Sequence, residues 1–366
     1  MEKPVTISVT VPVHNTAQYL PVCLASLLAQ SYPHLEIICV DDGSTDNSLQ
    51  ILNEYAARDS RIKVYHQEAQ GVSAARNTAL LYSTGEFVTS LDSDDYIAPD
   101  TYEKAAACIS DEVDWVSYGI QLVDKDGNPI PDHDGYYATK YEGILDFTPE
   151  MTHNMNVCIW SKLWRRSIMV EHNMLHPHGL VHEDDAIFYM YAPYVRKAAF
   201  IQDICYNYVQ RQGSIMHDDR KSIADAEQYL GILRYVHDFH QRNGLEPLRN
   251  KYIIAQFERA YYLVERFCPP YQRRQLAGMF RNLAQETGLA AAYPGDWRLR
   301  CLNLPGRILS AFIRRRSRCT QYRLGPLPLV SLHYTPDSAT PTLRFDLMHA
   351  LCGLLRRFSA CRKQAS

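Results

Sequence analysis

The 366-residue sequence lacks several patterns that would assign it to other classes of protein. None of its 10 cysteines stands in the C-x-x-C spacing of a zinc or redox site, so we expect free thiols and a reducing compartment. No uncharged apolar run approaches the ~18 residues that span a bilayer, and the first residues make a poor signal peptide. The net charge of −3 excludes a bulk polycation that binds nucleic acid. These absences favour a cytoplasmic protein.

The sequence also has no glycine-rich phosphate loop after its first predicted strand. Both the Gly-x-Gly-x-x-Gly pattern and the P-loop pattern are missing there. This argues against a dinucleotide dehydrogenase, a P-loop NTPase and a sugar nucleotidyltransferase. The strand instead runs into Pro12-Val13-His14-Asn15, residues suited to packing against a nucleotide base and hydrogen-bonding its edge.

The N-terminal half alternates β-branched runs with segments of helical periodicity. Strands are predicted at residues 5–11, 36–40, 61–66, 86–91 and 113–120, with single helices between most of them. The predicted fold class is therefore α/β, a mostly parallel central sheet flanked by helices. The pattern becomes helical after residue 216, so the predicted domains are a catalytic domain (1–216), a helical extension (217–300) and a basic C-terminal segment (301–366).

Acidic residues follow two of the predicted strands. Asp41-Asp42 ends the second, and Asp92-Ser93-Asp94-Asp95 ends the fourth. Ligands of parallel sheets bind beyond the carboxyl ends of the strands, so these side chains indicate a site, although acidic turns are the alternative. Neighbouring carboxylates repel one another, and Mg²⁺ or Mn²⁺ held together with substrate phosphates relieves that repulsion. We therefore expect a metal–diphosphate site at Asp92 and Asp94.

Four motifs in order carry a resemblance to a known family. They are Val11-Pro12-Val13-His14-Asn15, Val40-Asp41-Asp42-Gly43-Ser44-Thr45-Asp46, Gly71-Val72-Ser73-Ala74-Ala75-Arg76-Asn77 and Leu91-Asp92-Ser93-Asp94-Asp95. Together they resemble the family 2 inverting glycosyltransferases of the bacterial polysaccharide-forming type. The resemblance implies a GT-A fold that binds a nucleotide-diphosphate sugar. It also implies roles for the motif residues: base contacts from Pro12, His14 and Asp42 with Asn15 beside them, ribose-diphosphate contacts from Arg76 and Asp92, and metal ligation by Asp94. The family often has Tyr or Phe where this sequence has His14.

The resemblance extends to a possible catalytic base. An inverting transfer needs a carboxylate that takes the proton of the acceptor hydroxyl. The segment His182-Glu183-Asp184-Asp185 stands where the family carries this base, and we assign the role to Asp184, with Glu183 or Asp185 as second choices. The alternative is that these acids only complement the dipole at a helix N-terminus.

Further candidates lie around this segment. Trp160 is either a sugar-stacking residue or a core residue. The segment 206–215 resembles the Tyr-x-x-x-Arg-x-Gly-Ser-Ile ending of polysaccharide-forming members, so Arg211 and Ser214 are predicted to contact the diphosphate. His217 is a possible third ligand of the metal or a plain loop residue. A zinc site at His172, His176, His178 and His182 is the less favoured alternative to a loop beside the acids.

The last 66 residues are strongly basic, with 11 Lys and Arg against 2 acids. Runs such as Arg314-Arg315-Arg316 beside apolar residues are typical of membrane-surface contacts, and the alternative is an ordinary solvated helix. Aromatic residues do not interleave with them as nucleic-acid binding would require.

The sequence as a whole predicts a metal-dependent inverting glycosyltransferase. The expected donor is a UDP-sugar, because Asp42 can accept the N3–H of uracil, and the expected acceptor is a hydroxyl of a glycan or a lipid-linked saccharide. Peripheral attachment to the inner face of the cytoplasmic membrane would suit such an acceptor. The alternatives are a catalytically silent subunit that binds nucleotide sugar or glycan, against which Asp94 and Glu183-Asp184 argue, and a different nucleotide enzyme.

Overall fold

The computed structural model describes residues 4–132, 135, 137–138, 140–210, 223–245, 256 and 273–288, and the backbone of four strands between residues 314 and 345. The chain divides into two compact units, residues 1–260 and 261–366. The boundaries predicted at residues 216 and 300 stay predictions. Of the region predicted to be helical, 217–300, the structure describes residues 223–245, 256 and 273–288.

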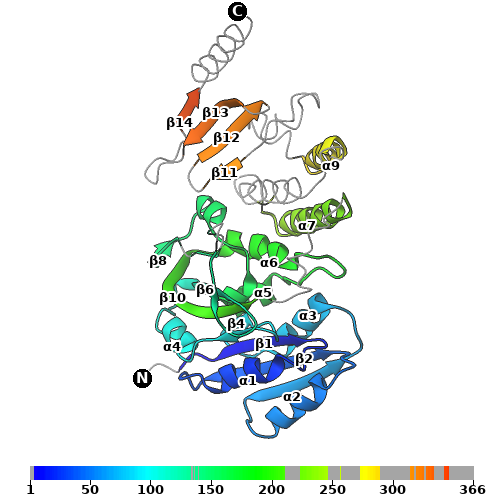
Figure 1. Cartoon of the computed structure of the whole chain (residues 1–366), viewed down its shortest axis with the longest axis vertical. Coiled ribbons are helices and arrows are strands. Elements are labelled where there is room, and N and C mark those ends of the chain that lie inside the picture. The colour runs from blue at the N-terminus through cyan, green and yellow to red at the C-terminus, as the bar shows by residue number, and fades with distance from the viewer. Residues whose placement is uncertain are drawn as a thin grey trace, which may run out of the picture. The chain divides into compact units, whose positions relative to one another are not determined.

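The first unit begins with the alternation of strands and helices that the sequence predicts (Figure 1). Its first elements are β1 (Ile7–Val13), α1 (Leu20–Leu28), β2 (Leu35–Asp42), α2 (Ser48–Ala56), β3 (Ile62–Gln67), α3 (Val72–Tyr82), β4 (Phe87–Ser90), β5 (Tyr96–Ile97) and α4 (Thr101–Ala106). The observed bounds of β1, β2, β3 and β4 lie within a few residues of the predicted ones, because β-branched runs are a strong local signal. The short strand β5 was not predicted.

The rest of this unit is less regular. It comprises β6 (Val113–Val123), β7 (Pro129–Ile130), β8 (Gly143–Asp146), β9 (Lys162–Arg165), α5 (Arg166–Glu171), α6 (Glu183–Tyr191), β10 (Lys197–Val209) and α7 (Ile223–Arg242), with short 3₁₀ turns at Pro149–Asn154, Ile159–Ser161 and Ala192–Tyr194. The described residues of the segment 124–142 are irregular apart from the two residues of β7.

The strands of the first unit form one sheet in the order β3-β2-β1-β4-β9-β6-β10-β5, with β7 and β8 paired outside this path. Strands β3, β2, β1 and β4 are parallel, and so are β6 and β10. Strand β9 runs antiparallel between β4 and β6. The predicted α/β fold with a central sheet between helices is confirmed. The sheet contains more antiparallel pairing than the sequence indicated, because β9 joins it from a segment without helical spacing.

Strand β2 shows how the sheet buries both faces. Ile37 and Cys39 belong to the large core that includes side chains of α1 and α2, whereas Ile38 and Val40 pack with Ala75 on α3. Figure 1 shows α1 and α2 on one side of β1 and β2, and α3 on the other. Alternate residues of a strand point to opposite faces, so an unbroken apolar run is what a doubly covered strand requires.

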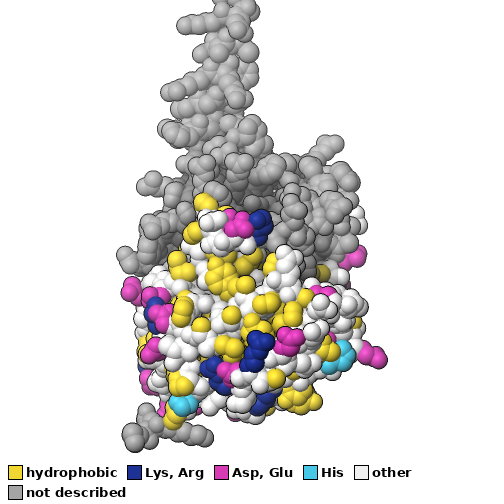
Figure 2. All heavy atoms as spheres, turned by 60° about the horizontal axis from the view of Figure 1, so that its bottom comes forward, with side chains coloured by type: hydrophobic (Ala, Val, Ile, Leu, Met, Phe, Trp, Pro, Cys, Tyr) yellow, Lys and Arg dark blue, Asp and Glu magenta, His cyan; other side chains and the backbone are white. Residues whose placement is uncertain are grey.

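One face of the described residues is mixed in charge. Figure 2 shows this face, on which basic and acidic side chains are interspersed rather than gathered by sign.

The five cysteines whose state the structure gives are free thiols, as the sequence predicts: Cys23, Cys39, Cys108, Cys158 and Cys205. Among the described residues, no helix is both long enough and apolar enough to cross a bilayer.

The second unit contains a helix and a small sheet. The described elements are α9 (Arg273–Glu286) and the antiparallel strands β11 (Arg314–Arg316), β12 (Cys319–Leu324), β13 (Leu327–His333) and β14 (Thr342–Phe345), in the order β11-β12-β13-β14. The three consecutive arginines therefore lie in a strand, where the sequence suggested a basic amphipathic segment. The membrane contact predicted for this segment stays a prediction.

A buried carboxylate fastens the central strands together. Glu36, on β2, accepts hydrogen bonds from the Ser8 hydroxyl on β1, from Lys63 Nζ on β3 at 3.0 Å, and from the backbone amides of Thr84 and Gly85 before β4. Burial alone would raise the pKa of Glu36, but the hydrogen bonds from Ser8, Thr84 and Lys63 outweigh it and lower the pKa to about 2. The ionised side chain therefore stabilises four neighbouring strands at neutral pH.

We predict that Glu36→Gln lowers the free energy of unfolding by about 2 kcal/mol or more at pH 7, because hydrogen bonds to a charged acceptor are lost. A carboxyl whose folded pKa lies below its unfolded value of about 4.3 stabilises fully above pH ~4.3 and loses that contribution as the pH falls towards 2. The difference from wild type should shrink across this window in urea denaturation. Glu54→Gln, an exposed change on α2, is the control; a Glu36 difference that does not depend on pH would contradict the assignment.

Candidate active site

The polar strand ends lie at one edge of the sheet. Val13 on β1 is in register with Asp41 on β2, and Thr10 on β1 is in register with Ser90 on β4. Residues that follow these three parallel strands therefore emerge side by side. This geometry brings Pro12, His14, Asn15, Asp42 and Asp92 to the same edge.

Asn15 joins the loop after β1 to the loop after β2. Its backbone is left-handed, with φ at 52°, and its Oδ1 accepts hydrogen bonds from the backbone amides of Thr45 at 2.8 Å and Asp46 at 3.3 Å. His14 Nδ1 lies 2.7 Å from the backbone oxygen of Asp42, and His14 itself is exposed. The exposed imidazole therefore lies beside the end of β2, and its predicted contact with a nucleotide base stays a prediction.

The carboxylate of Asp42 organises the loop that leads into α3. It is almost fully buried and accepts hydrogen bonds from Gln67 Nε2 at 2.7 Å, from the amide of Gln70 at 2.9 Å and from the amide of Gly71 at 2.7 Å. Gly71 has φ at 92°, a conformation that favours glycine. The carboxylate of Asp42 therefore shapes the loop before α3, and its predicted contact with a base stays a prediction.

The segment after β4 concentrates negative charge. Asp95 is buried and its two oxygens accept hydrogen bonds from the Tyr206 hydroxyl at 2.6 Å and from the amide of Val209 at 2.8 Å. Burial first, and then the charges of Asp94 and Asp92, raise the pKa of Asp95 well above its ordinary value. Asp95 is therefore a structural anchor between this segment and β10, whereas Asp92 and Asp94 are half-buried at the edge of the sheet.

One guanidinium connects the acids of two distant segments. Arg76, on α3, is 6% exposed and donates to Asp92 at 2.7 Å and to Asp184 at 3.3 Å, and it also pairs with Glu183. Burial would lower the pKa of Arg76, but Asp92, Glu183 and Asp184 together raise it above its ordinary value. The acid predicted to act as base, Asp184, and one of the acids predicted to bind metal, Asp92, therefore belong to one cluster.

The acids Glu183 and Asp184 open helix α6. His182 precedes them with φ at 66°, and its ring stacks on Tyr229 of α7 at 4.2 Å. Burial raises the pKa of Asp184 to about 8, with Glu183 and Asp92 adding to the effect and Arg76 opposing it. A side chain that changes charge near neutral pH is suited to accepting a proton from a bound hydroxyl.

An aromatic group lies next to these acids. Trp160 is 5% exposed and stacks on Tyr206 at 4.2 Å, and the backbone amide of Ile159, its neighbour, approaches Asp184 at 3.4 Å. Trp160 is thus a buried residue in the wall beside Asp184. The sequence analysis gave no role to Tyr206, the first residue of the segment 206–215, whose hydroxyl also accepts a hydrogen bond from the amide of Asp92 at 3.3 Å. The local pattern could not show its contact with Asp95, because the two residues lie more than 100 positions apart.

The remaining predicted residues divide into two groups. Arg211, Ser214 and His217 lie outside the described residues, so their predicted contacts stay predictions. In the part of the chain that the structure describes, no three His, Cys, Asp or Glu side chains come together as a metal site. The four histidines of the zinc alternative have different surroundings: the ring of His172 stacks on Tyr194, and His176 is buried next to Arg76.

The donor set at the end of β4 fits a hard divalent cation that arrives with its substrate. Mg²⁺ and Mn²⁺ sites of this kind take one or two carboxylates and fill the other positions with phosphate oxygens and water. Asp92 and Asp94 supply carboxylate oxygens, and their combined charge is strong enough to contribute to the raised pKa of Asp95. A cluster of three protein ligands is not needed for such a metal.

Comparison with known proteins gives a consistent assignment. The family model named glycosyl transferase family 2 matches residues 8–171. EpsH of Bacillus subtilis (strain 168) is 33% identical over 269 residues, which cover 69% of this chain and 74% of EpsH. TarS of Staphylococcus aureus (strain Mu50), a poly(ribitol-phosphate) β-N-acetylglucosaminyltransferase, is 27% identical over 268 residues, covering 71% of this chain and 44% of TarS.

Solved structures share the fold. The crystal structure of Staphylococcus aureus TarS 1–349 aligns with a TM-score of 0.61 at 22% identity, covering 88% of this chain and 97% of that one. The same fragment in complex with UDP-GlcNAc aligns with a TM-score of 0.55 at 20% identity, covering 93% of this chain and all of that one (100%). The arrangement of sheet and helices that places the acids together is therefore one known from experiment.

We predict that Arg76→Met lowers the free energy of unfolding by about 3–5 kcal/mol, because it leaves buried carboxylates without their cation. Urea denaturation at pH 7 measures the loss. Arg61→Met is the matched control: Arg61 pairs with Asp59 at 2.8 Å near the surface, so its removal should cost less than ~1 kcal/mol. Equal effects of the two substitutions would contradict the role of Arg76 as the shared counterion.

Proposed function

The chain belongs to glycosyl transferase family 2 and is a glycosyltransferase, and we propose that it transfers a sugar from a UDP-sugar to a hydroxyl with inversion at the anomeric carbon. The observation that carries this proposal is the ion-pair cluster in which Arg76 joins Asp92 to Asp184. Because Asp92 and Asp184 share one guanidinium, the cluster supports roles for both acids at a single bound substrate.

The donor is proposed from the edge of the sheet and from the relatives. TarS is named for transfer of N-acetylglucosamine and its fragment was solved with UDP-GlcNAc, so UDP-GlcNAc is the first donor to test. Pro12, His14 and Asn15 would line the base, and Asp42 lies beside them with its carboxylate holding the loop before α3. The proposed acceptor is a hydroxyl of a glycan or a lipid-linked saccharide in the synthesis of a cell-surface polysaccharide.

Asp184 is the proposed base. In an inverting transfer, the acceptor oxygen bonds to the anomeric carbon while the bond from that carbon to the diphosphate oxygen breaks, and the proton of the hydroxyl passes to a carboxylate. Asp184 lies in the first turn of α6 beside Arg76 and the wall that contains Trp160. Glu183 shares Arg76 with Asp184, and we propose that Glu183 holds Asp184 in place.

Arg76 and a divalent cation would share the charge of the leaving group. Mg²⁺ or Mn²⁺ bound at Asp94 and Asp92 would supply electrostatic stabilisation of the diphosphate. Arg76 carries a positive charge paired with Asp92 at this place. Its guanidinium would exchange part of its contact with Asp92 for the phosphate, since carboxylate and phosphate groups both accept hydrogen bonds from a guanidinium.

We predict that Asp184→Asn lowers kcat for transfer from UDP-GlcNAc by about 10²–10⁴-fold, because general-base catalysis is lost while the shape is kept. Asp94→Ala should raise the concentration of Mn²⁺ needed for half-maximal activity. Release of UDP is measured with Mn²⁺ present, over a panel of acceptors and of UDP-sugars.

Asp100→Asn serves as the matched control, since Asp100 pairs with Lys104 on the surface at the start of α4 and away from the cluster. Its activity should equal that of wild type. UDP release that is unchanged in Asp184→Asn and Asp94→Ala would remove both catalytic assignments and favour the silent-subunit alternative.

The pH dependence gives an independent test. Burial raises the pKa of Asp184 to about 8, and only the ionised carboxylate can accept a proton. We predict that kcat/KM rises with pH and reaches half of its maximum near pH 8, with a slope of one on the acidic side. A profile that stays flat between pH 6 and pH 9, at saturating metal, would contradict the assignment of Asp184.

A further inference from the structure

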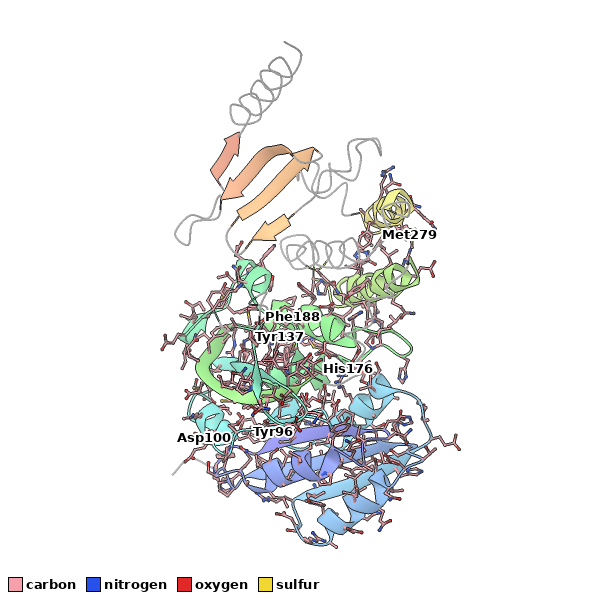
Figure 3. All side chains as sticks on the ribbon, viewed as in Figure 1. Tyr96, Asp100, Tyr137, His176, Phe188 and Met279 are labelled. Atoms are coloured by element: carbon pink, nitrogen blue, oxygen red, sulfur yellow. The ribbon has the colours of Figure 1, made fainter. Side chains whose placement is uncertain are left out.

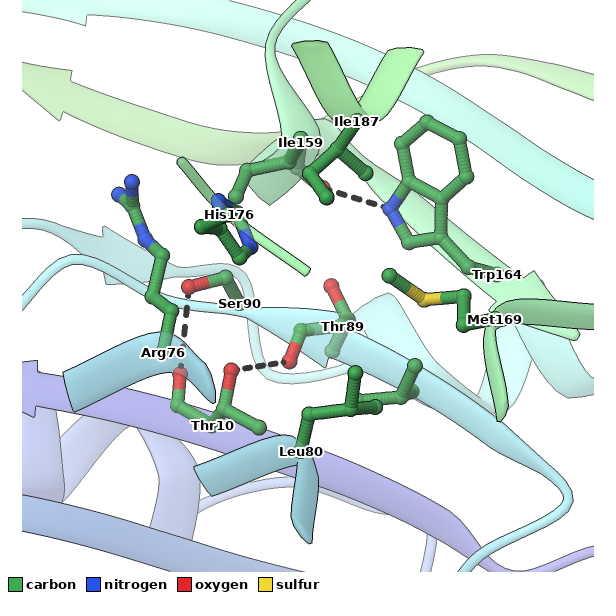
Figure 4. A pocket seen from close by; sticks show the side chains of 11 residues that line it. Thr10, Arg76, Leu80, Thr89, Ser90, Ile159, Trp164, Met169, His176 and Ile187 are labelled. Atoms are coloured by element: carbon green, nitrogen blue, oxygen red, sulfur yellow. Dashed lines mark hydrogen bonds between the residues drawn. The ribbon is translucent and has the colours of Figure 1, made fainter. Parts of the chain in front are cut away.

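A small pocket lies behind the guanidinium of Arg76. It encloses about 30 Å³, which is room for a water molecule. Figure 4 shows Arg76, His176, Ser90 and Thr10 on one side of it and apolar side chains, among them Trp164, on the other. The pocket therefore has a polar wall that belongs to α3, β1, β4 and the loop before α6.

Two buried nitrogen atoms of this wall are unsatisfied. Arg76 Nε and His176 Nδ1 have no hydrogen-bond partner among the described residues. His176 is 5% exposed, and burial, together with the nearby charge of Arg76, lowers its pKa well below the ordinary value. A neutral imidazole can accept a hydrogen bond at Nδ1, whereas Arg76 Nε can only donate one. The two atoms are thus chemically complementary.

Asn77 fixes the backbone at the same place. Its Nδ2 donates to the backbone oxygen of His176 at 2.9 Å, and its Oδ1 accepts from the amide of His176 at 2.8 Å. Asn77 follows Arg76 on α3, and His176 lies in the loop that leads to Glu183 and Asp184 (Figure 3). This two-point contact therefore ties the helix that carries the cation to the loop that delivers the acids.

We propose that Asn77 and His176 are positioning residues that orient Arg76 between the metal-side acid and the base, and that one buried water joins Arg76 Nε to His176 Nδ1. The inference rests on the proposed function, because it concerns the geometry of that reaction. A water in this pocket has a third possible partner in the hydroxyl of Ser90, which lines the same wall. Three polar partners are what a buried water ordinarily requires.

The imidazole is tested with two substitutions at one position. His176→Phe removes the acceptor, and His176→Asn keeps a polar atom near the place of Nδ1. We expect His176→Phe to lower kcat by about 10–100-fold, the scale of a small misplacement of a catalytic group, with KM for the acceptor unchanged. His176→Asn should restore most of the loss. His178→Phe, an exposed change two residues on, is the control and should behave as wild type.

The pH profile separates positioning from a merely structural role. If Arg76 turns away from Asp184, the carboxylate loses an opposing positive charge, so the acidic limb of kcat/KM should move to higher pH in His176→Phe and return in His176→Asn. A loss of folded protein with an unchanged limb and an unchanged kcat per folded molecule would overturn the proposal.

Asn77 is tested in the same way. Asn77→Ala removes both contacts to the backbone of His176 and should lower kcat and shift the acidic limb in the same direction as His176→Phe. Asn53→Ala, an exposed change on α2, is the control. If the effects of Asn77→Ala and His176→Phe simply add in the double variant, the two residues do not act on one group, and the joint role is wrong.

A measurement without substrate distinguishes this proposal from the proposed function. Nitrogen NMR of labelled histidine in the free protein reports which ring nitrogen of His176 carries the proton. An unprotonated Nδ1 from pH 6 to pH 8 supports the water bridge even if no sugar donor is found. A protonated Nδ1 would overturn it even if wild type proves fully active.

Discussion

The site depends on one buried positive charge shared by three carboxylates. A guanidinium that is 6% exposed is costly to bury, and only paired acids offset that cost. Because Asp92 follows a strand and Asp184 opens a helix far along the chain, the same ion pairs that satisfy Arg76 also bring two halves of the candidate site together. The electrostatics of the fold and the geometry of the proposed reaction therefore have one origin.

Burial raises the pKa of both Asp95 and Asp184, but the two carboxyls have different partners. Asp95 is held by Tyr206 and a backbone amide and is a structural carboxyl, whereas Asp184 has Arg76 beside it and a pKa of about 8. Burial is the largest cause in both cases, so the difference in role follows from which neighbours each acid has. Their partners thus separate Asp95, an anchor, from Asp92, Asp94 and Asp184, for which metal binding and proton transfer are proposed.

Much of this could be predicted from the sequence, because it is local. The strands and helices up to α4 follow from periodicity, and the acids at the ends of β2 and β4 follow from where those strands stop. What could not be predicted are partners far apart in the chain: the antiparallel strand β9, the anchor between Asp95 and Tyr206, and the contact between Asn77 and His176. No spacing rule connects such residues, since tertiary packing alone brings them together.

Asn77 illustrates why contacts between residues far apart in the chain could not be predicted. In the sequence it is the last residue of a motif next to Arg76, and nothing in the motif shows what its amide contacts. In the structure the side-chain amide makes two hydrogen bonds with the backbone of His176. The motif therefore places the buried cation and the residue that holds this loop at successive positions of one helix. Successive helical residues point in different directions, which allows Arg76 to face the acids while Asn77 holds the loop that delivers them. A substitution at Asn77 should therefore disturb the acids without touching them.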